Sequence, residues 1–248
     1  MTREVAVRFD HVSKKFGDMP VLDDVSFEVL RGQAFCILGR SGAGKSVSLR
    51  LMIGLIKPDA GNISVLGENV PQLDPSGLTR VRKQVGFLFQ YSALFDSISV
   101  GENVAFPLRR HTRMGNSEIQ KRVGELLDQV GLEPHRHKMP SDVSGGMRKR
   151  VGLARALALE PSILLVDEPS SGLDPVTSLE IDELLLDLKQ RRGTTVVVVT
   201  HNIPSARRIG DTLAFLHEGR ILEHGTPQQL ENSRQELVQR FMTVEGGT

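Results

Sequence analysis

The chain has 248 residues, 39% of them hydrophobic and 25% charged, with 31 Lys and Arg against 30 Asp and Glu. This composition excludes a disordered or fibrous protein, and the balanced charge excludes a general attraction to nucleic acid or anionic lipid. The longest apolar run has five residues, at 34–38, whereas a membrane-spanning helix needs about 20. Because the N-terminus also lacks the apolar stretch of a secretory signal, we expect the chain to stay where it is made.

Strands are predicted in two groups. Short candidates separated by Gly and Pro turns lie at residues 5–9, 25–29 and 62–66 and favour an antiparallel β portion. Runs of apolar residues, several of them β-branched, are typical of buried strands and lie at residues 34–38, 85–89, 163–166, 196–199 and 213–216.

Helical patterns alternate with the buried strands. One helix carries apolar residues at 49, 52, 53 and 56 and stops at Pro58. A second begins after Asp174 and Pro175, a capping residue and a residue suited to the first helical turn. This alternation predicts an α/β fold with a largely parallel sheet.

No linker divides the sequence, so we expect a single domain over residues 1–248. Its core is expected at about residues 1–90 and 160–226, and a helical subdomain at about 91–159 is inserted between two core strands. A C-terminal helix is expected at about 227–242, because Thr226 and Pro227 form a typical helix start.

A phosphate-binding loop follows the strand at 34–38. The pattern G-x-x-x-x-G-K-[ST] is matched between a strand and a helix, the context that it requires, by Gly39, Arg40, Ser41, Gly42, Ala43, Gly44, Lys45 and Ser46. Backbone amides and the helix N-terminus would hold phosphate oxygens, Lys45 would reach the terminal phosphates, and Ser46 would ligate Mg²⁺. The alternative is a glycine-rich turn without a ligand.

Two acids end the apolar strand at 163–166. Because open α/β sheets bind ligands at the carboxyl ends of their strands, we expect Asp167 and Glu168 on the same edge as the phosphate-binding loop. Asp167 would hold Mg²⁺ through water, and Glu168 would act as general base toward the attacking water. Alone, two acids after a strand would more often form a solvated turn.

A second glycine-rich helix start lies at Ser144, Gly145 and Gly146, ahead of a helix predicted over residues 148–159. Its amides are also suited to an anion. Within one chain and for one nucleotide this start would be redundant, whereas two chains facing each other could complete each other's sites.

The order of these motifs resembles that of an ABC-type ATPase subunit, from Val5 to about Gln229. The matching positions are Gly39 to Ser46, Gln90, Ser144 to Gly146, Asp167 and Glu168, Ser171 to Asp174, and His201. The resemblance implies an ABC-type nucleotide-binding domain with a RecA-like parallel-sheet core. It also implies an ATPase that binds ATP and Mg²⁺ and acts as a homodimer, with each ATP between the phosphate loop of one chain and the Ser144 segment of the other.

The resemblance implies further roles. Phe16 would stack on adenine, Val47 would extend the phosphate loop, and Asp174 would couple the two sites of the dimer. Gln90 would contact Mg²⁺ and the attacking water, and His201 would contact the γ-phosphate, so the implied catalytic set is Lys45, Gln90, Glu168 and His201. Simpler alternatives are a core position for Phe16 and a structural role for His201.

Departures from the common family pattern indicate a subfamily. Met147 stands where Gln is usual and precedes a basic run at 148–150, Val47 stands where Thr is usual, and Arg40 replaces a common Pro. These features are similar to the ATPases of Mla/Mce-type bacterial phospholipid transporters. That resemblance implies an MCE-type lipid-binding partner and a place on the cytoplasmic face of the inner membrane. It also implies an integral-membrane permease, contacted through residues 91–110.

The permease contact has a physical basis in the sequence. Apolar residues of the 91–110 segment could form a groove for a helix of the permease, and they are Leu94, Phe95, Val104, Phe106 and Leu108. The alternative is that most of them face the core of the helical subdomain.

Other functions remain open. The chain could serve an ABC transporter for another substrate class, such as amino acids. A soluble ABC ATPase of DNA repair or translation usually carries long coiled-coil insertions or two ATPase halves, and this sequence contains neither. A signalling GTPase would share the phosphate loop but would not explain Gln90 or the Ser144 segment.

Overall fold

The computed structural model describes residues 4–244. Its strands are β1 (Val5–Phe16), β2 (Met19–Leu30), β3 (Ala34–Leu38), β4 (Ala60–Val65), β5 (Glu68–Asn69), β6 (Val85–Leu88), β7 (Ile163–Asp167), β8 (Thr195–Thr200), β9 (Thr212–His217) and β10 (Arg220–Gly225). Its α-helices are α1 (Lys45–Met52), α2 (Pro75–Lys83), α3 (Val100–His111), α4 (Asn116–Gln129), α5 (Gly145–Ala156), α6 (Pro175–Arg192), α7 (Ile203–Ile209), α8 (Pro227–Glu231) and α9 (Glu236–Val244). The ends of the predicted 1–248 domain, residues 1–3 and 245–248, lie outside the described part.

The strands form two sheets. One has the order β10-β9-β3-β8-β7-β6 and is parallel except for β10, which runs antiparallel to β9. The other is antiparallel with the order β2-β1-β4-β5. The expected combination of a mostly parallel sheet, an antiparallel β portion and a helical unit is confirmed.

Side chains of the parallel strands alternate between two hydrophobic cores. In β3, Phe35 and Ile37 belong to the core shared with the antiparallel sheet and α1, whereas Cys36 and Leu38 belong to the core shared with the other helices. Both faces of the sheet are therefore covered, which explains why these strands appear in the sequence as unbroken apolar runs.

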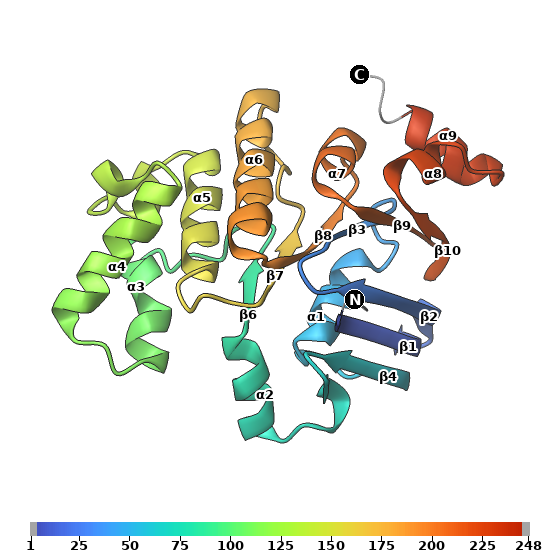
Figure 1. The fold of residues 1–248 in the computed structure, drawn as a ribbon, viewed down its shortest axis with the longest axis horizontal. Helices are drawn as coiled ribbons and strands as arrows, with labels where there is room; N and C mark the ends of the chain where they lie inside the picture. Colours follow the sequence, from blue (N-terminus) through green and yellow to red (C-terminus); the bar gives the residue numbers. More distant parts are fainter. Residues whose placement is uncertain (1–3, 245–248) are drawn as a thin grey trace.

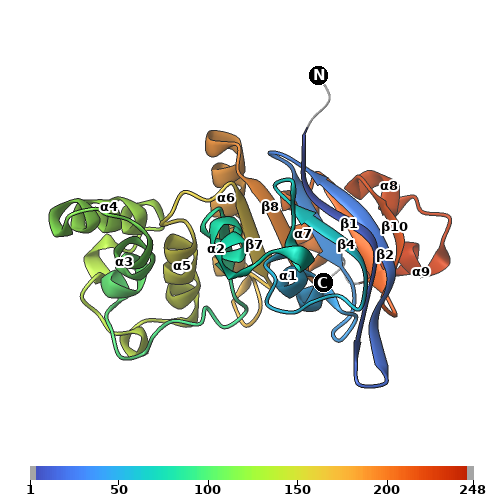
Figure 2. The same ribbon diagram turned by 90° about the horizontal axis from the view of Figure 1, so that it is seen from below.

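The helices are distributed around this frame. Helix α1 packs between the two sheets and contacts β4, β7 and β8. Helices α3, α4 and α5 lie together on the side of the molecule away from β1, β2 and β4, as both views show (Figures 1 and 2). At the other end α8 packs on β9 and β10, and Phe241 of α9 contacts Phe215 of β9 with ring centroids 4.7 Å apart.

The prediction for the helix at 148–159 was wrong at both ends. Helix α5 begins at Gly145 because the Ser144 hydroxyl accepts a hydrogen bond from the Met147 amide, at 3.2 Å, and so caps the helix there. It ends at Ala156. The glycines of the Ser144 segment therefore form the first turn of the helix rather than a loop before it.

The prediction of one C-terminal helix over 227–242 was also wrong. The chain forms α8 and α9 instead, separated by residues 232–235. In this break the Ser233 hydroxyl donates to the Glu223 carboxylate of β10 and accepts from the Gln235 amide at 3.0 Å. Such side-chain bonds compete with continuous helix.

The sequence analysis also missed elements and underestimated two strands. It did not predict β5, β10 or α2, and β1 and β2 each have 12 residues. Register shifts between them let this long ribbon bend. Within residues 4–244 no helix is both long and apolar enough to cross a bilayer.

Candidate functional site

The carboxyl ends of β3, β7 and β8 carry the predicted phosphate-binding and acidic residues. The three strands are parallel neighbours in register, with Leu38 paired to Thr200 and Asp167 paired to Val199. The loop after β3, the acids at the end of β7 and the residues after β8 therefore meet at one edge of the sheet, as the sequence predicted.

The loop between β3 and α1 surrounds a buried ammonium group. Gly44 caps α1 with a φ of 101°, and a Cβ there would lie 2.7 Å from a backbone oxygen of β2, so the position requires glycine. Lys45 is 5% exposed, and its Nζ donates to the carbonyls of Gly39 at 2.8 Å and Arg40 at 3.2 Å. Residues 40–42 form the exposed tip of the loop.

Ser46 and Asp167 face each other at the start of α1 and the end of β7. The Ser46 hydroxyl donates to Asp167 Oδ1 at 2.8 Å. Burial raises the pKa of Asp167, and the Ser46 hydrogen bond acts in the opposite direction. Hydroxyl and carboxylate oxygens are hard ligands, and Mg²⁺ is usually held by one or two carboxylates together with water and substrate phosphates. The Ser46 and Asp167 pair therefore fits Mg²⁺ that is shared with phosphate. Among residues 4–244 no group of three or more His, Cys, Asp or Glu could hold a metal.

Glu168 lies in an uncommon backbone conformation, with a φ of 47°. Its amide donates to the Val199 carbonyl at 2.9 Å. Its carboxylate accepts hydrogen bonds from the Thr200 hydroxyl at 3.1 Å and the His201 amide at 3.3 Å. His201 Nδ1 lies 3.0 Å and Lys45 Nζ 3.3 Å from the same carboxylate. The structure thus brings Lys45, Glu168 and His201 together.

Gln90 and Phe16 do not join these contacts among the residues that the structure describes. Gln90 follows β6, whose Leu88 pairs with Val166 of β7, but within the described residues its side chain forms no hydrogen bond to the Ser46 and Asp167 pair. Phe16 ends β1, is 47% exposed, and has the Lys14 ammonium 5.6 Å from its ring centroid. Phe16 is therefore no core residue, and stacking on adenine stays a prediction.

The remaining predicted residues form a second group, at the starts of α5 and α6. A Cβ on Gly146 would lie 2.5 Å from the Thr177 methyl group of α6. Asp174 caps α6 by accepting hydrogen bonds from the amides of Val176 and Thr177, both at 3.0 Å. The hydrogen bond from the Thr177 hydroxyl, together with these two amide bonds, lowers the pKa of Asp174. In the described part of the chain, no hydrogen bond or ion pair joins this group to the phosphate loop.

Sequence reasoning missed three side chains that support the site. Thr200 contacts the Glu168 carboxylate, as above. Lys149 of α5 donates from Nζ to the Glu168 carbonyl at 2.8 Å. Arg155 of α5 donates to the carbonyls of Ser92 at 2.6 Å and Ala93 at 2.7 Å, in the turn after Gln90. The basic run at 148–150 was noticed in the sequence, but its spacing could not show which residue faces inward.

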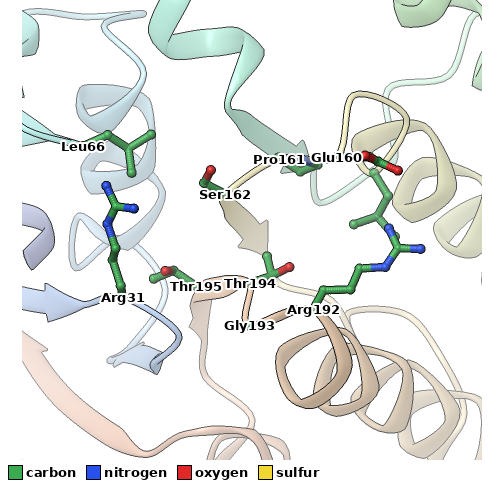
Figure 3. Close-up of a pocket in the computed structure, with 10 residues that line it drawn as sticks. Arg31, Leu66, Glu160, Pro161, Ser162, Arg192, Gly193, Thr194 and Thr195 are labelled. Carbon is green, nitrogen blue, oxygen red and sulfur yellow. The ribbon is translucent and has the colours of Figure 1, made fainter. Parts of the chain in front are cut away.

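A cavity of about 630 Å³ lies at the opposite end of the sheet, next to Ser162, Thr194 and Thr195, where β7 and β8 begin (Figure 3). Arg31 and Arg192 extend from opposite sides of it, and their guanidinium groups do not converge (Figure 3). None of the predicted site residues lines this cavity, so it is separate from the site described above.

The family described as ABC transporter matches residues 22–171. The chain is 40% identical over 242 residues to the probable ribonucleotide transport ATP-binding protein mkl of Mycobacterium leprae. This match covers 98% of this chain and 70% of that protein. It is 44% identical over 223 residues to the methionine import ATP-binding protein MetN 1 of Pseudomonas fluorescens, covering 88% and 67%. The chain thus spans about two thirds of the length of these curated relatives.

Solved structures show the same fold. The dimeric post-hydrolysis structure of the ATP-binding cassette MJ0796, bound to ADP and Pi, is 36% identical with a TM-score of 0.83, and the match covers 89% of this chain and 98% of that one. The cbiO1 structure from Clostridium perfringens, part of the ABC transporter complex cbiONQ, is 28% identical with a TM-score of 0.84, covering 97% and 96%.

The Lys45 ammonium generates the first prediction. In Lys45→Ala, ATP loses a charged hydrogen-bond donor, so we expect the Kd for ATP to rise about 10- to 100-fold, as for loss of hydrogen bonds to charged groups. Titration with a fluorescent ATP analogue measures this change. Lys57→Ala, which removes an exposed lysine beyond α1, should bind as the unmodified chain does. Equal affinity in the Lys45 and Lys57 variants would contradict the assignment of the phosphate loop.

Proposed function

The chain belongs to the ABC transporter family of ATP-binding proteins, and we propose that it is the ATPase subunit of a phospholipid transporter in the bacterial inner membrane. As a family member it is an ATPase that binds ATP with Mg²⁺. The proposal adds that it works as a homodimer on the cytoplasmic face of that membrane, bound to a separate permease and an MCE-type lipid-binding partner.

The observation that carries the ATPase chemistry is the contact set around Lys45, Ser46, Asp167 and Glu168. The amides of residues 39–47 and the Lys45 ammonium are suited to phosphate oxygens, and Ser46 and Asp167 are suited to Mg²⁺, with Gln90 as a further ligand. When bound, Mg²⁺ supplies charge neutralisation on the phosphates.

Glu168 is the proposed general base. Its carboxylate is 9% exposed and is held by the Thr200 hydroxyl, the His201 amide and the His201 ring. Held in this way, the carboxylate can take a proton from water that attacks the γ-phosphate. His201 Nδ1 faces Glu168, and the 53% exposure of the His201 side chain leaves it accessible to the phosphate.

The separation of the site into two groups supports the homodimer. Ser144, Gly145, Gly146 and Asp174 lie at the starts of α5 and α6, without a hydrogen bond to the phosphate loop in the part of the chain that the structure describes. A second copy could supply this group to the nucleotide on the first. The dimeric MJ0796 cassette with ADP and Pi is consistent with such an arrangement.

Glu168→Gln tests the general base. The amide keeps the size of the side chain but cannot accept the proton, so we expect kcat for ATP hydrolysis to fall by at least about 10²-fold while ATP binding persists. The variant should then accumulate as an ATP-bound dimer, which size-exclusion chromatography with ATP detects. Turnover close to that of the unmodified chain would remove Glu168 from this role.

An aromatic groove supports the permease contact. A cavity of about 370 Å³ lies between α2 and β6 on one side and α3 on the other. Phe95 and Phe106 line it, are 43% and 47% exposed, and pack with ring centroids 4.7 Å apart. Phe87 and Phe89 from the β6 side complete its aromatic wall, with centroids 4.1 Å apart.

The groove differs from the sequence prediction in its residues. Val104 and Leu108 were expected to contribute, but they are 0% and 2% exposed and lie in the core of the helical unit. The loop that presents Phe95 is fixed by buried Asn103, whose side chain bonds the Phe95 amide at 2.8 Å and carbonyls of Phe95, Ile98 and Ser99. This loop follows Gln90, so the groove is joined to the nucleotide edge through a short, hydrogen-bonded segment.

The charges around the groove indicate the chemistry of the permease helix. Arg82, Lys83 and Arg155 line the same cavity as the aromatic residues. The pKa of His111, also in its lining, is lowered by burial and by the positive charges of Lys83 and Arg110. A helix with an apolar face and an acidic residue fits this surface.

Phe106→Arg tests the groove. Added charge should prevent a helix from docking, so we expect loss of co-purification with the permease and of permease-dependent stimulation of ATP hydrolysis. ATP hydrolysis by the isolated chain should not change. Met114→Arg, at another exposed hydrophobic residue (38% exposed) outside the groove, is the matched control. Equal co-purification of both variants would contradict the proposed contact.

The lipid assignment is supported by the subfamily features, above all by Met147. A thioether cannot make the amide hydrogen bonds of the usual Gln, and the Met147 side chain packs partly buried against the helical core. The competing candidate is amino-acid transport, favoured by 44% identity to a methionine import ATP-binding protein.

Affinity capture of the tagged chain from detergent-solubilised membranes separates these candidates. The Phe106→Arg variant serves as the control for non-specific capture. A small multi-span permease, a membrane-anchored lipid-binding protein and enriched phospholipid, all absent from the control, would support lipid transport. A solute permease without enriched lipid would favour amino-acid transport, and capture only of nucleic acid or ribosomes would contradict both.

A further inference from the structure

Lys149 is a buried lysine for which the nucleotide chemistry above provides no role. It is 4% exposed, and its Nζ donates a hydrogen bond of 2.8 Å to the backbone carbonyl of Glu168. Its neighbours in the basic run have other contacts, since Arg148 donates to the Val143 carbonyl at 3.1 Å and Arg150 pairs with Glu180. Lys149 alone of this run reaches the nucleotide edge.

The backbone of Glu168 is strained and is held by hydrogen bonds at both of its polar groups. Its φ of 47° is in the left-handed region, where a non-glycine residue is strained and is retained only if its surroundings fix it. The Glu168 amide is fixed by the Val199 carbonyl of β8 at 2.9 Å. The other backbone polar group, the Glu168 carbonyl, accepts two hydrogen bonds, one of 2.8 Å from Lys149 Nζ and a longer one of 3.2 Å from the Ser171 amide. Of these two donors, only Lys149 comes from outside the turn that follows β7.

We propose that Lys149 is a positioning residue for ATP hydrolysis: its hydrogen bond fixes the Glu168 peptide and thereby aims the Glu168 carboxylate at the attacking water. This proposal rests on the assignment of Glu168 as general base under "Proposed function". Within residues 4–244 Lys149 makes no hydrogen bond or ion pair to the phosphate-binding loop at 39–46, so its proposed contribution acts through Glu168.

The surroundings of Lys149 favour a strong hydrogen bond. Burial lowers the pKa of Lys149 to about 8, whereas the nearby carboxylates of Asp167 and Glu168 act in the opposite direction. The side chain is therefore mainly an ammonium at neutral pH, and a charged donor makes a shorter and stronger bond than a neutral one.

The place of Lys149 on α5 gives this contact a second consequence. The same helix begins with Gly145, capped by Ser144, in the segment proposed to contact the nucleotide of the other chain. The start of α5 would contact the nucleotide bound to the other chain, while Lys149 of the same helix holds the Glu168 peptide of its own chain. Helix α5 would thereby link the two sites of the dimer.

Lys149→Met and Lys149→Gln test the proposal, with Lys121→Met at an exposed lysine of α4 as the matched control. Met fills the space but donates no hydrogen bond, whereas Gln retains a donor. We expect Lys149→Met to lower kcat about 10- to 100-fold, as for misplacement of a reacting group by about 1 Å. The KM for ATP and the ATP-dependent dimer should change less than twofold. Lys149→Gln should recover a substantial part of kcat, and Lys121→Met should match the unmodified chain.

Several outcomes would overturn the proposal. A kcat of Lys149→Met within twofold of the unmodified chain would do so. Equal loss of kcat in the Met and Gln variants would indicate a purely structural lysine. The same conclusion would follow if ATP affinity and melting temperature fell together while the kcat of the folded fraction stayed unchanged. If Glu168→Gln itself keeps normal turnover, the general-base assignment fails instead, and the two failures are thereby distinguished.

Discussion

The burial of four charged groups at the carboxyl edge of the parallel sheet is the constraint on which the rest of the molecule depends. Lys45, Lys149, Asp167 and Glu168 are each less than 10% exposed, and breaking a buried ion pair typically costs about 3–5 kcal/mol. Each of these buried charged groups has a hydrogen-bonding or charged partner, and the partners come from different elements of the fold. Lys45 faces Glu168 and two carbonyls of its own loop, Asp167 faces a hydroxyl of α1, and Lys149 reaches across from α5. The edge can form only when the loop after β3, the end of β7 and helix α5 are all in place, so the same contacts that prepare the chemistry also join the helical unit to the sheet.

Helix α5 is the element on which these requirements converge. Its start carries the Ser144 cap, Lys149 holds Glu168, and Arg155 holds the turn after Gln90, in which Ser92 and Ala93 have φ values of 62° and 46°. A Cβ on Gly152 of the same helix would lie 2.9 Å from Leu88 of β6, so α5 lies directly against that strand. Two strained backbone segments, at the proposed general base Glu168 and in the turn after Gln90, are thus held by side chains of one helix. Strain of this kind persists only where the surroundings over-determine it, and a displacement of α5 would release both.

The sequence predicted most accurately what depends on local pattern. The strands β3, β7 and β8 were found because unbroken apolar runs are typical of buried parallel strands, and the positions of Lys45 and Glu168 at one edge follow from strand direction alone. The extent of α5 and the break before α9 were missed, because a cap at Ser144 and the side-chain contacts of Ser233 decide them. The support by Lys149 could not be predicted, since it depends on which side of α5 faces β7 and not on spacing. Val104 was misplaced in the groove for the same reason: apolar character does not show whether a side chain faces its own core or a partner.

The residues proposed for ATP hydrolysis and those proposed for permease binding lie in different parts of the chain. This separation explains why the ATPase chemistry is easier to infer than the transported substrate. The roles proposed for the residues at the nucleotide edge concern phosphate, water and Mg²⁺, and none of these ligands depends on what a permease carries. The features that distinguish one transporter from another must therefore lie where the chain meets other proteins. In this chain the surface proposed for the permease combines exposed Phe95 and Phe106 with cationic Arg82 and Lys83. A permease helix that matches it would present apolar side chains and a carboxylate together. The loop bearing Phe95 is tied through Asn103 to α3 and follows Gln90 in the chain. Under the proposed function, a change in the contacts of Gln90 would therefore be passed to the proposed docking surface. Coupling then requires no contact between the ATPase and the cargo, only a partner helix whose charge and shape fit this groove.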